Sequence, residues 1–451
     1  MKTTSIILAA GQGTRMKSEL PKVLHPVCGK PMVWHALEAA QNATDEKPIM
    51  VIGHGAEQVR EAVGDAVRFV IQRERLGTGH AVQQAESTLK GESAFVLVSS
   101  ADMPLLTEDT LSELIRIQKA NDGPMTMLTI IADDPRGFGR VLRTEDGGVK
   151  AIVEEADATE EEKAIKELNV GAYCFSAEWL WDALKRIPLS AKGEYYLTDT
   201  VALAVEAGMR VNALTLEDAV EAIGVNSRIH LSEAEAGMRS RVNRKHLLNG
   251  VTMIDPASTY IGVEVEIGQD TVIQPNTYLR GKTVIGKGCE IGPNTIITDC
   301  KIGNKCEILA SVLELATLED NVDIGPFARL RKGAHLAKGV HMGNFGEVKD
   351  SYLGEGVKMG HFSYIGNADI GKDTNIGAGT ITCNYDGKNK HHTEIGEDVF
   401  IGSDSMLVAP LVIGDRARTG AGAVVTKNVK KDTLVVGMPA RAIRKLDKET
   451  K

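Results

Sequence analysis

The chain has 451 residues, too many for one ordinary hydrophobic core, so two or three domains are expected. Its composition, 43% hydrophobic and 25% charged, is typical of a globular protein and excludes a disordered one. The net charge of -9 argues against a general affinity for nucleic acid or an anionic membrane, because both require a basic face, but it leaves room for local phosphate pockets.

The N-terminal residues run directly into a predicted core strand and show no cleavable signal pattern. No stretch approaches the ~20 apolar residues that a membrane span needs. The cysteines show neither a C-x-x-C motif nor a zinc spacing, so we expect free thiols in a reducing compartment, and hence a cytoplasmic protein. They are Cys28, Cys174, Cys289, Cys300, Cys306 and Cys383.

Residues 1–228 alternate short β-rich runs with helical patterns, which predicts right-handed βαβ units and a mainly parallel, Rossmann-like α/β domain. Ligands of such sheets bind at the carboxyl ends of the strands. Residues 229–250 are charged and helical in pattern, and they are predicted to form a linker helix. The predicted strands are Ser5–Leu8, Pro48–Ile52, Ala94–Val98 and Met125–Ile131; the predicted helices are Trp34–Gln41, Gly55–Val63 and Thr107–Ala120.

A glycine-rich turn follows the first strand, in the string Leu8-Ala-Ala-Gly-Gln-Gly-Thr-Arg-Met16, and Leu20-Pro21-Lys22 comes next. Such a turn lets backbone N–H groups approach phosphate oxygens. Met16 stands where the dinucleotide fingerprint needs a third glycine, and the G-K-[ST] of a Walker A loop is missing. A bare Gly-x-Gly could be a plain structural turn, but the whole string resembles the signature of sugar-nucleotide pyrophosphorylases.

After Val251 an aliphatic residue followed by glycine recurs every six positions, and a fixed short period indicates a solenoid. Three such repeats would complete one triangular coil, with the aliphatic side chain inside and the small residue at the corner. This predicts a parallel β-helix over residues 251–451 and argues against a β-sandwich, whose strands alternate with period two. Pairs in phase include Ile261-Gly262, Ile267-Gly268, Ile285-Gly286, Ile291-Gly292, Ile370-Gly371, Ile376-Gly377, Ile395-Gly396 and Ile401-Gly402.

Two interruptions of the repeat are expected, one at about Leu313–Asp323 and one at the polar insertion Thr382–Glu394. Loops on a rigid scaffold commonly carry function. Three tracts also follow one another at roughly one coil's spacing, which predicts that Arg331, Lys349 and His361 stack into one groove. On its own His361 could equally be a surface or satisfied core histidine. Adjacent His391 and His392 should point apart, which argues against a metal site.

Taken together, these motifs resemble the bifunctional N-acetylglucosamine-1-phosphate uridyltransferase/glucosamine-1-phosphate acetyltransferases, over nearly the whole chain. The resemblance implies UTP, acetyl-CoA and glucosamine-1-phosphate as substrates, with Mg²⁺ held by Asp102 and Asn226. Arg15 and Lys22 would stabilise the triphosphate. Sugar contacts would come from Gly139, Glu154, Asn169 and Asn226. The implied nucleotide-binding residues are Leu8, Ala9, Gly11, Gly13, Thr14, Arg15, Lys22, Gln72, Gly77 and Thr78.

In the second half the resemblance implies that His361 is the general base of an acetyl transfer on a left-handed β-helix, and that the protein is a homotrimer. Lys390 would reach a phosphate across a subunit boundary. The acceptor would contact Arg331, Lys349, Tyr364 and Asn375. The implied acetyl-CoA contacts are Asn384 and Tyr385, which also match residues that orient the amino sugar, with Ser403, Ala421 and Arg441.

Two alternatives stay open: a single-activity nucleotidyltransferase with a structural β-helix, and a non-catalytic scaffold. Asp102 could be an ordinary turn or cap residue. The chain also departs from the family pattern, because Ser100-Ala101 precede Asp102 where an aromatic residue and glycine are usual.

Overall fold

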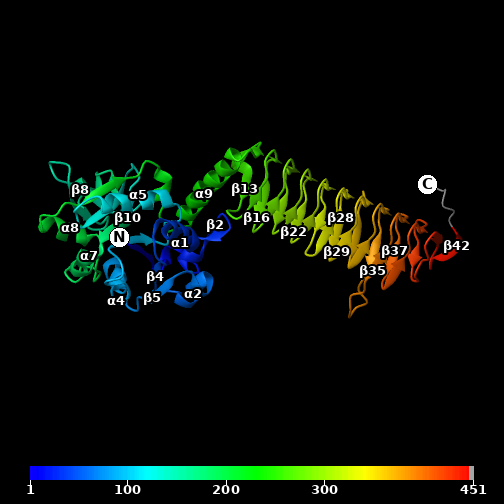
Figure 1. Cartoon of the computed structure of the whole chain (residues 1–451), viewed down its shortest axis with the longest axis horizontal. Coiled ribbons are helices and arrows are strands. Elements are labelled where there is room, and N and C mark those ends of the chain that lie inside the picture. Colours follow the sequence, from blue (N-terminus) through cyan, green and yellow to red (C-terminus); the bar gives the residue numbers. More distant parts are fainter. Residues whose placement is uncertain (446–451) are drawn as a thin grey trace. The chain divides into compact units, whose positions relative to one another are not determined.

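The computed structural model describes residues 1–445, and the chain divides into two compact units, Met1–Met238 and Arg239–Lys451 (Figure 1). The boundary falls within helix α9, Arg228–Leu248, inside the segment expected to link the halves. Among the described residues, no helix combines the length and the apolar composition that crossing a membrane requires.

The first unit is built on a sheet with the order β11-β7-β10-β6-β1-β4-β5. Neighbouring strands are parallel except at β10, which is antiparallel to both β6 and β7. The chain runs from β1 outward to β4 and β5, then returns to place β6 on the other side of β1. A crevice is therefore expected where the carboxyl ends of β1 and β6 meet. The strands are β1 Thr3–Ala9, β4 Ile49–Ile52, β5 Arg68–Ile71, β6 Phe95–Ser100, β7 Met125–Ile131, β10 Glu167–Ser176 and β11 Asn212–Thr215.

Helices cover this sheet, and a hairpin of β8, Arg140–Arg143, and β9, Val149–Val153, extends it beside β10. Helix α5 shows how the sequence sets such bounds, because the Thr107 hydroxyl accepts the backbone N–H of Thr110 at 3.2 Å and caps the first turn. The helices are α1 Met32–Ala43, α2 Ala56–Val63, α3 Thr78–Gln83, α4 Glu86–Leu89, α5 Glu108–Lys119, α6 Glu160–Lys163, α7 Ala177–Leu184 and α8 Asp199–Glu206.

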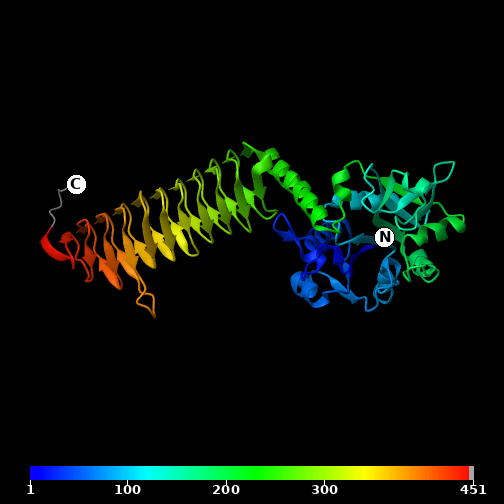
Figure 2. The same cartoon turned by 180° about the vertical axis from the view of Figure 1, so that it is seen from behind.

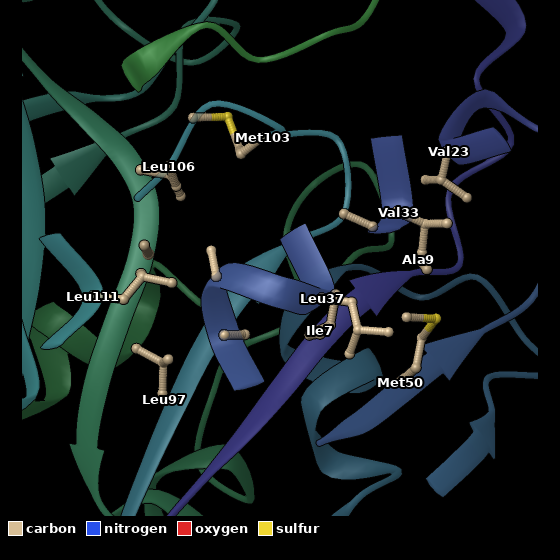
Figure 3. Close-up of a cluster of buried hydrophobic side chains, with 14 of the residues drawn as sticks. Ile7, Ala9, Val23, Val33, Leu37, Met50, Leu97, Met103, Leu106 and Leu111 are labelled. Atoms are coloured by element: carbon tan, nitrogen blue, oxygen red, sulfur yellow. The ribbon is translucent and has the colours of Figure 1, made fainter. Parts of the chain in front are cut away.

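Both faces of the sheet are buried, so β1 is buried almost throughout and is apolar from Ile6 to Ala9. Successive side chains point to opposite faces, and Ile6 therefore packs in one core while Ile7 packs in the other. Figure 3 shows the second core, where Ile7 of β1 lies near Leu37 of α1. The two cores fix β1, whose carboxyl end carries the glycine-rich turn.

The second unit is a left-handed parallel β-helix whose strands form three stacks of parallel strands (Figures 1 and 2). Ile261 of β13, Thr259–Ile261, pairs with Leu279 of β16, Thr277–Arg280, one coil of 18 residues later. The repeated aliphatic side chains fill the axis and are buried. Among the strands named in residues 251–445, β42, Arg441–Lys445, departs from parallel pairing, because it is antiparallel to β41, Thr433–Val436.

The glycine of the repeat is required where a coil corner lies against the next coil. A Cβ on Gly402 would lie 2.6 Å from the carbonyl oxygen of Thr419 and 2.8 Å from the backbone nitrogen of Ala421. Those atoms are backbone and cannot move aside, so a side chain is excluded there. This explains why the aliphatic-glycine pair recurs with the coil.

The expected interruption at Leu313–Asp323 is wrong. Ile297 pairs with Leu313, and Leu313 pairs with Leu330, without any inserted loop. Some repeats in this segment have five residues instead of six, and Leu315 adopts the left-handed region, φ 50, at one of the shorter turns. The six-residue sequence period is therefore lost, while the parallel strand pairing continues. The second interruption is real: a loop leaves the scaffold between β34, Ile381–Cys383, and β35, Thr393–Ile395, drawn in orange in Figure 1.

Candidate active sites

A cleft of about 820 Å³ opens at the carboxyl ends of β1 and β6. Nine of the predicted site residues line it, from four separate segments of the first unit. They are Leu8, Ala9, Gly11, Lys22, Gln72, Gly77, Thr78, Asp102 and Glu154. The cleft therefore brings together the glycine-rich turn, the second glycine segment, the end of β6 and the end of β9.

Glycine is needed at two positions around this cleft. Gly13 has φ +64, and a Cβ there would lie 2.7 Å from Cβ of Lys22. Gly77 has φ +96, and a Cβ there would lie 2.5 Å from the carbonyl oxygen of Tyr195. Both positions combine the left-handed region with close packing, which only glycine accepts without strain. Gly13, Thr14 and Arg15 lie outside the lining, and Arg15 is exposed on a 3-10 helix, Thr14–Met16.

Lys22, which was predicted to stabilise a triphosphate, is bonded to two other predicted site residues. Its ammonium donates to the carboxylate of Asp102 and, at 3.0 Å, to Oδ1 of Asn226. These are the two residues predicted to hold a metal, and they come from positions more than 100 residues apart. Two oxygen acceptors therefore converge on one cation, as the ligands of a hard metal ion would.

The surroundings keep Asp102 ionised. Burial by itself would raise the pKa of Asp102, but the Lys22 ammonium and hydrogen bonds from Lys22 and Ser100 outweigh it and lower that pKa. Ser100 thus supports the carboxylate from the position where the family usually has an aromatic residue. The backbone carbonyl of Asp102 accepts the N–H of Val225 at 2.8 Å, which ties this turn to the segment carrying Asn226.

Of the predicted sugar contacts, Gly139, Glu154 and Asn169 lie near the end of β9, and Glu154 lines the cleft. Burial raises the pKa of Glu154, although Thr198 donates a hydrogen bond to it at 2.9 Å. Asn169 is buried; its side-chain amide donates to the Tyr173 hydroxyl at 2.7 Å, and its backbone N–H donates to the carbonyl of Gly139 at 2.9 Å. Gly139 and Asn169 thus shape the wall behind Glu154.

The cleft lining also contains residues that were not among the predicted site residues, including Gln12, Arg75, Glu194 and Tyr196. Arg75 donates to the side-chain oxygen of Gln12, so the two lie against each other. Gln12 stands within the glycine-rich string, and Arg75 precedes the second glycine segment by one residue, so both carried a usable signal. Glu194 and Tyr196 lie within the long loop between α7 and α8, and only the folded chain brings them here.

In the second unit, Arg331, Lys349 and His361 were predicted to stack in one groove, and this prediction is wrong for His361. Leu330 pairs with Val348, and Lys349 pairs with Gly366, so Arg331 and Lys349 do occupy one column. Gly346 pairs with Ser363, which places His361 at the corner before β31, Ser363–Gly366. Lys349 and His361 are 12 residues apart, about two thirds of a coil, so His361 lies one corner earlier.

Three cations gather at the column of Arg331 and Lys349. The pKa of Lys349 is lowered, first by the Lys390 ammonium beside it and then by the charge of Arg331. Arg331 donates to Glu347 at 2.9 Å. The Tyr364 hydroxyl lies over Gly366, because a Cβ on that glycine would be 2.5 Å from it. Lys390 therefore approaches Lys349 within its own chain.

The inserted loop is held by a dense set of hydrogen bonds. Asp386 accepts from the backbone N–H groups of Lys388 and Asn389 and from the His391 ring, each at 2.7 Å. Asn384 is buried and donates to Asn367 at 2.7 Å, while Tyr385 is exposed. His391 and His392 contact different carboxylates, Asp386 and Asp369.

A second column runs along the corner that carries His361. Gly379 donates to the carbonyl of Phe362, and Gly422 donates to that of Ser403, which sets the register of successive coils. His361, Ser403 and Ala421 therefore occupy equivalent places on successive coils, with Ala378 between His361 and Ser403. Asn375, on β33, Asn375–Ile376, lies just before this corner, and Arg441 is exposed at the start of β42.

The two columns lie at opposite ends of β31. Five residues separate His361 from Gly366, the residue in register with Lys349, which amounts to roughly 16 Å of extended chain. That length is the upper limit of the backbone separation, and it places the His361 corner and the cation column at distinct positions on one chain.

Comparison with known families agrees with both halves. Residues 5–186 match the MobA-like NTP transferase domain, and residues 264–299 and 392–427 match the bacterial transferase hexapeptide repeats. The chain is thus a bifunctional transferase, a nucleotidyltransferase joined to a hexapeptide-repeat acyltransferase.

Full-length relatives narrow this class. The bifunctional protein GlmU of Streptococcus agalactiae serotype V is 49% identical over 97% of this chain and 95% of its own length. That of Geobacillus sp. strain WCH70 is 48% identical over 100% of this chain and 97% of its own. The bifunctional protein GlmU of Caldanaerobacter subterraneus is 50% identical over 96% of this chain and 94% of its own length. The chain belongs to the GlmU family, which confirms the resemblance drawn from its motifs.

Proposed function

We propose that the protein acetylates glucosamine-1-phosphate with acetyl-CoA and then transfers UMP from UTP to the resulting N-acetylglucosamine-1-phosphate, releasing pyrophosphate. The observation that carries the proposal is the convergence of Asp102 and Asn226 on one cation in a cleft that also holds the glycine-rich turn. The absence of any disulfide among the six cysteines supports a cytoplasmic setting.

For uridylyl transfer, Asp102 and Asn226 would hold Mg²⁺, which suits their oxygen donors and would neutralise phosphate charge when bound. The glycine-rich turn would cradle the triphosphate, Gln72 and Gly77 would read the nucleoside, and Glu154 would orient the sugar. A sugar-phosphate oxygen then attacks the α-phosphorus of UTP, and the bond to pyrophosphate breaks. Positioning and charge neutralisation suffice, so no protein nucleophile is needed.

For acetyl transfer, the phosphate of the acceptor would bind Arg331 and Lys349, beside Tyr364, with Asn375 and the inserted loop completing the pocket. Lys390 and Arg331 repel the Lys349 ammonium there, and the phosphate of the acceptor would relieve that repulsion. His361 would take a proton from the amine as its nitrogen attacks the acetyl carbonyl and the thiolate of coenzyme A leaves. The corner column of Ser403 and Ala421 would line the coenzyme, with Arg441 beyond.

The separation of the two columns supports assembly as a homotrimer, in which the His361 corner of one copy would meet the cation column of another. Phe327, Phe345 and Phe362 follow that corner and are 61%, 59% and 54% exposed. Phe327 and Phe345 stack at 5.5 Å in the left-handed region, a strained conformation for a bulky residue. Exposed aromatic side chains held in this way suit an interface.

The test is a reconstitution with glucosamine-1-phosphate, acetyl-CoA, UTP and Mg²⁺, in which free thiol and pyrophosphate are followed separately and each substrate is omitted in turn. We expect thiol without UTP, and pyrophosphate that needs acetyl-CoA unless N-acetylglucosamine-1-phosphate is supplied. Pyrophosphate with no thiol under any condition would leave a single-activity nucleotidyltransferase. Binding of UTP without turnover would leave a scaffold.

A further inference from the structure

Lys22 carries a feature that the proposed reaction does not require. Its side chain is only 10% exposed, and its ammonium lies between the two residues proposed as metal ligands, bonded to both. A metal ion and this ammonium cannot occupy that place together, because like charges at contact distance in a buried site repel strongly.

We propose that Lys22 is a built-in counter-cation, whose ammonium fills the place between Asp102 and Asn226 until a nucleotide draws it away. This deepens the proposed function and rests on it. A free divalent cation then binds weakly, whereas one that arrives with a nucleoside triphosphate binds well, because the phosphates give the displaced ammonium a new partner.

The surrounding backbone supports movement of this one side chain. The N–H of Ala101 donates to Leu8 at 3.0 Å, and the carbonyl of Asp102 accepts from Val225 at 2.8 Å, so both proposed ligands stand on fixed turns. Lys22 begins a 3-10 helix, Lys22–Leu24, that is closed by its own backbone hydrogen bonds.

The structure also indicates where the Lys22 ammonium would move. A Cβ on Gly13 would lie 2.7 Å from Cβ and 3.3 Å from Cδ of Lys22, so the stem of this lysine runs directly beneath the glycine-rich turn. A rotation about its side-chain bonds would carry the ammonium from Asp102 to the turn, where the proposed function places the phosphates. The place between the ligands would then be free.

Metal affinity without nucleotide tests this directly. Mn²⁺, a hard cation with a spectroscopic signal, is titrated into the full-length protein by electron paramagnetic resonance, with no nucleotide present. If the ammonium vacates its place about a tenth of the time or less, Lys22→Met should bind Mn²⁺ at least about tenfold more tightly than the wild type. Adding Asp102→Ala to Lys22→Met should abolish the tight binding.

Arg75→Met is the matched control, because it removes one positive charge from the same cleft without touching either ligand. An equal gain in Arg75→Met would assign the effect to net charge and overturn the proposal, as would unchanged or weaker binding in Lys22→Met. Circular dichroism checks folding, and Lys22→Gln replaces Lys22→Met if that variant is unfolded.

A second titration separates the two proposals. Wild-type protein is titrated with Mn²⁺ in the presence of UTP. If Mn²⁺ with UTP does not bind, the metal site of the proposed function fails. If it binds while Lys22→Met leaves free-metal affinity unchanged, the metal site stands and the counter-cation role alone is wrong.

Discussion

At the scale of single residues, the two proposed chemistries depend on different side chains in separate units of the chain. Asp102 closes one turn of the α/β unit, where Ser100 and Lys22 keep it ionised. His361 stands at a β-helix corner with an exposed ring. Neither residue contributes to a hydrophobic core, but removal of Asp102 would leave the nearly buried Lys22 ammonium without its carboxylate, so folding of that variant is checked first.

Asp102→Ala should abolish uridylyl transfer and leave acetylation unchanged, because only the first site loses a metal ligand. His361→Ala should do the reverse, lowering the acetylation rate by about 10²–10⁴-fold. Thiol release and pyrophosphate release are measured separately on each purified variant. Loss of both activities in either folded variant would contradict two independent sites.

Glu154 makes a prediction about pH. Burial raises its pKa, so the folded protein holds a proton that the unfolded chain releases, and stability falls as pH rises from the usual carboxyl range through the raised value. Glu154→Gln keeps the oxygen that accepts from Thr198 but carries no charge. We expect its melting temperature to exceed that of the wild type by about 2 °C at pH 7, while the difference disappears in acid. If Glu154→Gln still melts at a higher temperature than the wild type in acid, the difference does not come from ionisation of Glu154.

At the scale of elements, much of the fold follows from local pattern. Strand β7, Met125–Ile131, has the predicted bounds, and α5 lies inside its predicted span with Thr107 as cap, because turn and cap chemistry is local. The position of His361 could not be predicted correctly from the sequence, because one coil has three corners. His361 follows Lys349 by 12 residues, which is less than one full coil. Glu194 and Tyr196 were beyond reach because the cleft gathers them only through tertiary packing.

The coil geometry also predicts which glycines tolerate a side chain. Gly402→Ala should destabilise the β-helix by at least about 1–3 kcal/mol, because its Cβ would meet the backbone of the next coil. Gly360→Ala is the matched control, since the nearest atom to its Cβ is a His341 ring nitrogen at 3.7 Å. Thermal unfolding of both variants measures the difference. Equal stabilities of the two variants would contradict the prediction, because they would show that neighbouring coils can move apart to accommodate the Cβ at low cost in free energy.

At the scale of the whole molecule, the separation of His361 from Arg331 and Lys349 leads us to expect that acetylation depends on an assembly of chains. If the columns meet between copies, a mixture of His361→Ala and Lys349→Met chains, unfolded and refolded together, should regain about a quarter of the wild-type acetylation rate. Each variant refolded alone is the control. No recovery in mixed assemblies of confirmed size would place both columns of a site on one chain.

The stacked coils described above have one further consequence, for how the chain can change in length. Every predicted acetyl-site residue lies at or beyond Arg331, while the coils from β13 to β24, Asp323–Ile324, carry none of them. Each coil bonds only to its neighbours, so a whole coil could be gained or lost there without altering either column. The first half of the β-helix is in effect an adjustable spacer, and its length is free to drift over evolution while the chemistry at the far end stays unchanged.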